Sequence, residues 1–283
     1  MRAAVVLLPA LFLTACASVD TTPSASLIAG APGELTSSEG LRAKARFRVD
    51  APAVRAARTL RIEPSLFEAG LVENVTDRQR EIVSQTLNQS LCRELSRRFE
   101  IVAPGAPADL VVRAQITRVE ATGAEVAAVS TVGRFASPIP FTPRLPVGLG
   151  SLVVEGAARD ASNVPKAVMV WGRGADMFTT SARASSIGDA FTLARAFSKD
   201  FAKLLIRGDD PFKSASGTPP RPRRKPAPAE CAAWGAGPGA VGFVSGRLGL
   251  PPEMTAPKSQ LPISAPQAES TAGGTRTPSP PRR

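Results

Sequence analysis

Two stretches of the chain, residues 76–98 and 186–207, carry apolar side chains at helical spacing. In the first stretch apolar residues recur every four positions, and in the second they recur at i, i+3, i+4 and i+7. An amphipathic helix of this length is stabilised mainly by packing of its apolar face. The sequence therefore predicts two helices that pack on a common core, and any fold for this chain has to bury both apolar stripes.

Local signals mark the ends of both predicted helices. Thr76 and Gln79 form a capping-box pattern at the start of the first helix. We expect Ser186 and Asp189 to cap the second helix, and Gly208 to end it.

Alternation of apolar and polar residues predicts strands around these helices. The predicted strands cover residues 59–63, 99–102, 109–120, 151–159 and 166–173, and residues 160–163 form a turn between the last two. The order of elements, β-α-β-β-insert-β-β-α, is typical of an α+β fold. We expect a two-layer sandwich in which two helices cover one face of a mixed or antiparallel sheet, flanked by disordered tails.

The N-terminus resembles the signal of a bacterial lipoprotein. Arg2 precedes an apolar run over residues 3–13, which is too short to span a bilayer, and Leu13-Thr14-Ala15-Cys16 matches the lipobox. The resemblance implies removal of residues 1–15 and attachment of acyl chains such as palmitate to Cys16, and two or more chains anchor a protein stably. Because Ala17 follows the cysteine, it also implies delivery to the outer membrane of a Gram-negative bacterium, facing the periplasm. The alternative is a cysteine that ends an ordinary secretory signal.

Composition divides the mature chain into three parts. We expect a flexible tether over residues 16–45, an α+β lipoprotein domain over 46–213 and a Pro-rich, basic, largely disordered tail over 214–283. The tail holds nine Lys/Arg and three Asp/Glu, so it contributes +6 of the net charge of +11. A tail of this kind could contact anionic lipid, lipopolysaccharide or cell wall, or it could serve only as a solvated segment. Because the charge lies in the tail, we expect no nucleic-acid partner.

The chain contains no histidine. It therefore has no Ser-His-Asp triad, no Cys-His pair and no histidine zinc site. We expect no metal and no cofactor, and the sequence identifies no small-molecule ligand. Carboxylate chemistry is left, with candidates Asp160, Asp176, Asp189 and Asp200. A turn, a helix cap and a polar helix face explain Asp160, Asp189 and Asp200 structurally, so we expect no enzyme, and a carboxylate-dependent hydrolase remains an alternative.

Two cysteines remain once Cys16 is lipidated. An oxidising compartment permits a disulfide between Cys92 and Cys231, which would join the tail to the domain. The alternative is a buried, apolar Cys92 and an unrelated Cys231.

The insert over residues 121–150 is apolar but interrupted by prolines and glycines. Long loops of this kind are often functional. Its large apolar residues form a candidate surface for a protein partner: Phe135, Ile139, Phe141, Leu145 and Val147.

Several segments together resemble the bacterial lipoprotein family of domain of unknown function 3313 (DUF3313). They read TLRIEPSLF (59–67), QTLNQSLCRELSRRFEIVAPGAPADLVVRAQITRV (85–119), PVGLGSLVVEGAARD (146–160), MVWGRGADMF (169–178) and GDAFTLARAFSKDFAKLL (188–205). The likeness covers about residues 50–213, and the activity of the family is unknown.

A looser likeness is to periplasmic β-α-β-β modules of outer-membrane assembly lipoproteins. Residues 99–102, Ala108-Asp109 and Arg159-Asp160 hold the matching places. The likeness implies a non-catalytic module that binds an envelope protein. The alternatives are a structural lipoprotein that contacts the cell wall or lipopolysaccharide through its basic tail, and the hydrolase.

Overall fold

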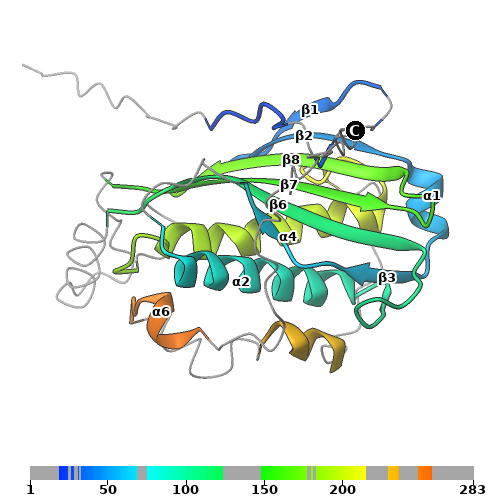
Figure 1. Cartoon of the computed structure of the whole chain (residues 1–283). Coiled ribbons are helices and arrows are strands. Elements are labelled where there is room, and N and C mark those ends of the chain that lie inside the picture. The colour runs from blue at the N-terminus through cyan, green and yellow to red at the C-terminus, as the bar shows by residue number, and fades with distance from the viewer. Residues whose placement is uncertain are drawn as a thin grey trace, which may run out of the picture.

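The computed structural model describes residues 19–24, 27–28, 31, 33–68, 75–123, 148–176, 180, 183–214, 229–235 and 248–256. The fold is α+β: one mixed sheet carries the two long helices α2 and α4 on one face (Figure 1). The strands are β1 (Thr36–Glu39), β2 (Lys44–Val49), β3 (Thr59–Ile62), β4 (Leu66–Phe67), β5 (Glu100–Ile101), β6 (Leu110–Glu120), β7 (Ser151–Arg159) and β8 (Pro165–Gly174). The helices are α1 (Ala51–Ala56), α2 (Asp77–Leu95), α4 (Gly188–Arg207), the 3-10 helix η1 (Ala229–Trp234) and α6 (Pro252–Thr255).

The sheet has eight strands, seven of them in the order β1-β2-β8-β7-β6-β3-β5, while β4 pairs with β6. Strands β1, β2, β8, β7 and β6 are antiparallel neighbours, whereas β3 runs parallel to both β6 and β5. The hairpin β7–β8 turns at Asp160–Asn163, where Asn163 adopts a positive φ of 63°. The predicted fold class and this predicted hairpin are confirmed.

The main core lies between the sheet and the helices α2 and α4. Trp171 of β8 packs edge-on against Phe197 of α4, with ring centroids 5.9 Å apart, and Phe197 stacks on Phe201. The backbone of β7 passes close to these rings, since a Cβ at Gly156 would lie 2.9 Å from Phe197 Cζ. The Trp171 indole N–H donates to the carboxylate of Asp200 at 3.1 Å, which satisfies the one polar atom of a fully buried side chain.

The start of α2 follows the predicted capping box. The Thr76 hydroxyl accepts from the Gln79 backbone N–H, and the Gln79 side chain accepts from the Thr76 N–H. The predicted cap of α4 is wrong: Ile187 is the N-cap residue, and no side chain caps the helix. Ser186 instead accepts a hydrogen bond from the Gln79 side chain, so tertiary contacts use the residues that the pattern assigned to the cap. Gly208 ends α4 in the left-handed conformation as expected.

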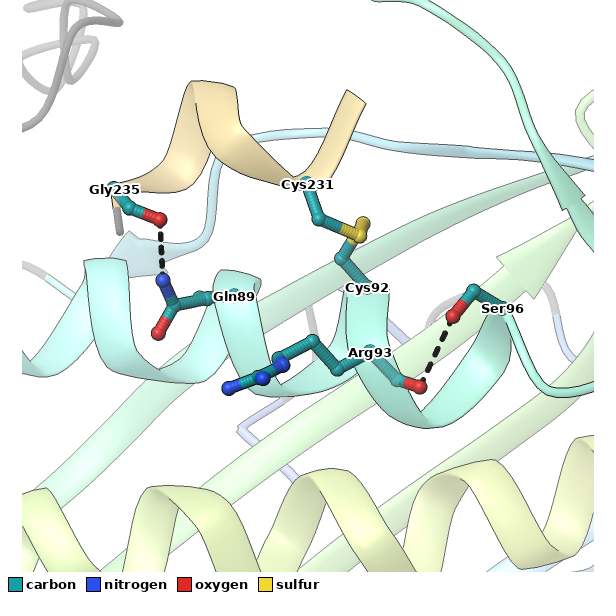
Figure 2. The surroundings of a disulfide bond; sticks show 6 residues. All are labelled: Gln89, Cys92, Arg93, Ser96, Cys231 and Gly235. Carbon is teal, nitrogen blue, oxygen red and sulfur yellow. Dashed lines mark hydrogen bonds between the residues drawn. A yellow bond between two sulfur atoms is a disulfide. The ribbon is translucent and has the colours of Figure 1, made fainter. Parts of the chain in front are cut away.

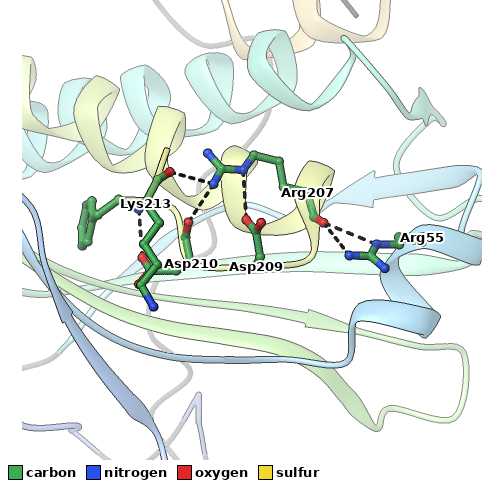
Figure 3. Close-up of polar contacts among 6 residues, drawn as sticks. Arg55, Arg207, Asp209, Asp210 and Lys213 are labelled. Carbon is green, nitrogen blue, oxygen red and sulfur yellow. Dashed lines mark hydrogen bonds and ion pairs between the residues drawn. The ribbon is translucent and has the colours of Figure 1, made fainter. Parts of the chain in front are cut away.

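Ordered structure begins earlier than the boundary predicted at residue 46. Strands β1 and β2 start at Thr36 and Lys44, within the stretch predicted to be a tether. The Ser38 hydroxyl of β1 donates to Asp210 at 2.7 Å, and Asp210 lies just beyond α4. Arg207, at the end of α4, pairs with Asp209, and its carbonyl accepts from Arg55 of α1 (Figure 3). Because β1 reads Thr-Ser-Ser-Glu, it has no apolar alternation, and its place is fixed by pairing with β2 and by these polar contacts.

Parts of the C-terminal region predicted to be disordered also pack on the domain. Helices η1 and α6 lie against α2, on the side away from the sheet (Figure 1). Cys231 and Trp234 of η1 are buried there. In the described ranges, no helix combines the length and the apolar character that crossing a membrane would require.

Candidate functional site

The sheet face opposite the helices is covered in part by the N-terminal strap, which we define as residues 19–24, 27, 28 and 31. The strap crosses β8 closely, since a Cβ at Gly172 would lie 2.9 Å from the side chains of both Val19 and Thr21. Ile28 then packs in a small second core that β7 and β8 complete with Val153, Ala157, Val168 and Val170. The guanidinium of Arg159 donates to the Leu27 carbonyl at 2.8 Å. The described segment that begins three positions after Cys16 is therefore held against the sheet.

Glu155 lies in the middle of this covered face and is fully buried. One of its carboxylate oxygens accepts from the Ser24 backbone N–H at 2.5 Å, and the other has no hydrogen-bond partner among the described residues. Burial raises the pKa of Glu155, hydrogen bonds from Ser24 oppose that rise, and the nearby carboxylate of Glu68 adds to it. Glu155 thus holds the strap through its hydrogen bond from Ser24, and the strength of that bond depends on whether the Glu155 carboxyl is protonated.

The four candidate aspartates do not converge on one site. Asp160 accepts from the backbone N–H groups of Ser162 and Val164 within the β7–β8 turn, and these contacts, led by Val164, lower its pKa. Asp176 pairs with Arg173 at 2.9 Å, and Asp200 with Lys203 at 2.8 Å.

Asp189 links three segments that are distant in the sequence. Its carboxylate accepts from the Gly150 N–H at 2.9 Å, and its own N–H donates to the Thr122 hydroxyl at 3.1 Å. The Thr122 N–H in turn donates to the Ser186 carbonyl. Thr122 and Gly150 lie at the two ends of the insert, so Asp189 fixes both of its ends at the start of α4.

Cys92 of α2 and Cys231 of η1 are joined by a disulfide, with Cα atoms 5.7 Å apart (Figure 2). The Gln89 side chain donates to the Gly235 carbonyl beside it. Of the two alternatives left open by the sequence, the structure has the covalent link between α2 and the C-terminal region.

The family comparison matches most of this domain. The profile of the family described as "Protein of unknown function (DUF3313)" matches residues 31–201, which is more than half of the chain. The chain belongs to the DUF3313 family. The DUF3313 match contains the sheet and most of α4, whereas most of the strap and Cys231 lie outside it.

Two solved structures with similarity to this DUF3313 chain are forms of the PelC dodecamer from Paraburkholderia phytofirmans. One has a TM-score of 0.34 and 11% sequence identity, and it covers 58% of this chain and 97% of the PelC chain. The other, a PelC variant, has a TM-score of 0.33 and 9% identity with the same coverage. Similarity at this level does not assign a function. A comparison with curated proteins finds no match.

Two of the predicted sites lie outside the residues that the structure describes. These are the lipidation site Cys16 and the candidate partner surface Phe135, Ile139, Phe141, Leu145 and Val147. Sequence reasoning missed Glu155, although one signal was present: it is the single charged residue within the otherwise apolar stretch Leu152–Ala158.

Proposed function

We propose that this DUF3313 protein is a lipid-anchored protein of the bacterial envelope, attached to the outer membrane and facing the periplasm, that acts as a non-catalytic binding or assembly module. The observation that carries the proposal is the position of the lipobox relative to the strap. Cys16 precedes Val19 by three positions, and Val19 already contacts β8.

This spacing sets how far the domain would lie from a lipid on Cys16. Three extended residues reach about 10 Å, whereas a flexible tether of thirty residues would have a typical end-to-end distance of about 30 Å. A lipid on Cys16 would therefore hold the strap-covered face next to the membrane. The opposite, helical face and the insert would then be available to a partner.

The four candidate aspartates already have partners within the chain, and this favours binding over catalysis as the function. Asp160, Asp176, Asp189 and Asp200 each accept hydrogen bonds or ion pairs from the chain itself. In the described part of the chain, no three His, Cys, Asp or Glu residues are grouped so that they could hold a metal ion. The sequence has no histidine, so the commonest general base near neutral pH is missing.

The insert is the surface that we assign to the partner. Thr122 and Gly150, at its two ends, both form hydrogen bonds with Asp189, so the two ends of the insert are fixed. Its large apolar residues suit the centre of a protein–protein interface, where aromatic side chains are enriched.

The test combines fractionation with crosslinking in cells. We expect the wild-type protein in the outer-membrane fraction and Cys16→Ala in a soluble fraction. We also expect an envelope protein to crosslink to the wild type and to be lost when Phe135 and Phe141 are both replaced by serine. The matched control is Leu41→Ser, which changes a fully exposed apolar residue outside the insert.

Two results would overturn the proposal. Identical fractionation of Cys16→Ala would remove the lipid anchor and the location inferred from it. Unchanged crosslinks in the double serine variant would show that the insert is not the partner surface.

A further inference from the structure

Two arginines share one aromatic ring at the start of α4. The guanidinium carbons of Arg183 and Arg195 lie 4.9 Å and 4.6 Å from the centre of the Phe191 ring. Such cation–π contacts favour a guanidinium held over the ring face. A third arginine, Arg93 of α2, is close enough to act on Arg195 electrostatically, and its side chain leaves α2 next to the disulfide (Figure 2).

Within the described residues, this arginine cluster lacks a counter-charge. No ion pair there involves Arg93, Arg183 or Arg195. Arg183 is only 5% exposed and donates to the Leu250 carbonyl at 3.1 Å, but its Nε is buried with no acceptor. Burial, together with the positive charges of Arg183 and Arg93, lowers the pKa of Arg195 to about 10, so Arg195 stays charged at neutral pH.

The buried arginine is held in place by the backbone around it. The Ala184 N–H donates to the Gly249 carbonyl, and the Ser185 N–H donates to the Arg183 carbonyl. The chain also packs tightly on the first turn of α4, since a Cβ at Gly188 would lie 2.9 Å from Arg183 Cβ. The Arg183 side chain is therefore positioned before any ligand arrives, which reduces the entropy lost on binding.

We propose that Arg183 and Arg195 form an oxyanion-binding site, with Arg93 at its rim. A phosphate or carboxylate group offers two or more acceptor oxygens that match the planar guanidinium. Such a group would supply the missing negative charge, accept from the unpartnered Nε of Arg183 and offset the repulsion among the three cations. The site is independent of the proposed lipid anchor, because it lies on the helical side of the sheet and uses no residue of the strap.

Titration calorimetry of the full chain in neutral detergent tests the proposal, with inorganic phosphate and acetate as separate probes at ionic strength fixed with sodium chloride. We expect saturable binding of at least one probe. Loss of a charge-assisted hydrogen bond costs about tenfold or more in affinity, so Arg195→Gln should weaken binding by at least that factor. Tighter binding of phosphate would assign a phosphate ligand, and tighter binding of acetate a carboxylate.

Two further variants separate loss of the binding site from a general loss of positive charge or of folding. Lys199→Gln removes one positive charge from the exposed side of α4 and should leave affinity within about twofold. Arg93→Gln changes an exposed residue, so it should fold normally and still weaken binding measurably. The proposal is overturned if neither anion binds the wild type, or if Arg195→Gln, shown by circular dichroism to be folded, binds as tightly as the wild type.

Discussion

Removing the disulfide should release the segment Ala229–Gly235 while the sheet remains folded. The change is the double substitution Cys92→Ala and Cys231→Ala. Apart from the disulfide, the described contacts of this segment are few: Trp234 is 6% exposed, and Gln89 donates to the Gly235 carbonyl. Burial of one large aromatic side chain contributes about 3 kcal/mol, and one hydrogen bond contributes about 1 kcal/mol.

The opposing term is the entropy lost when the segment becomes ordered. Fixing the backbone of seven residues costs at least about 7 kcal/mol, which exceeds the roughly 4 kcal/mol from the two contacts. The disulfide reverses this balance because it already holds the two chain positions together, 139 residues apart in sequence. We therefore expect the segment to detach in the double alanine variant, with little change in the sheet and α4.

Tryptophan fluorescence measures this release directly. The chain has two tryptophans, and Trp171 is fully buried in the main core. In the double alanine variant we expect a red-shifted emission component that iodide quenches, with the far-ultraviolet circular dichroism nearly unchanged. Adding Trp234→Phe to the variant should remove that component. If emission and quenching match those of the wild type, the segment packs without its covalent link, and the entropy estimate is refuted.

Two further predictions concern β7. Gly156→Ala should lower the free energy of unfolding by about 1–3 kcal/mol, because the added methyl group would overlap Phe197 and Phe201 in a packed core; an unchanged urea midpoint would contradict this. Glu155→Gln should become more stable relative to the wild type as the pH rises from about 4.5 to 8. Because its pKa is raised in the folded protein, Glu155 favours the folded state when its carboxyl is protonated. The wild type therefore has this stabilisation in full at acid pH and loses it as the pH rises through the folded-state pKa of Glu155. Glutamine does not titrate, so the variant does not lose stability in this way. A difference in unfolding free energy that stays constant over this range would show that Glu155 is not the titrating group.

Sequence patterns within a single helix or turn predicted the features that depend only on neighbouring residues. The stripe and capping box of α2, the periodicity of α4 and the turn after β7 all appear where the sequence places them. Each depends on residues within a few positions of one another, so neighbouring side chains carry enough information. Asp189 shows where this reasoning fails: its spacing from Ser186 matches a cap, but its carboxylate accepts from Gly150, thirty-nine positions away in the chain.

The sequence by itself determined the α+β class and the two packed helices, because apolar periodicity and capping residues can be recognised within contiguous stretches of the chain. It also carried the resemblance to DUF3313. Only the tertiary structure decided that the strap covers part of the second face of the sheet, that Glu155 is buried beneath it, and that Arg183 and Arg195 meet over Phe191. Thr36–Glu39 has no apolar alternation and the strap has no regular period, so neither segment carries a local signal of where it lies. Their positions follow from contacts with residues far away in the chain, which form only once the sheet and helices are assembled.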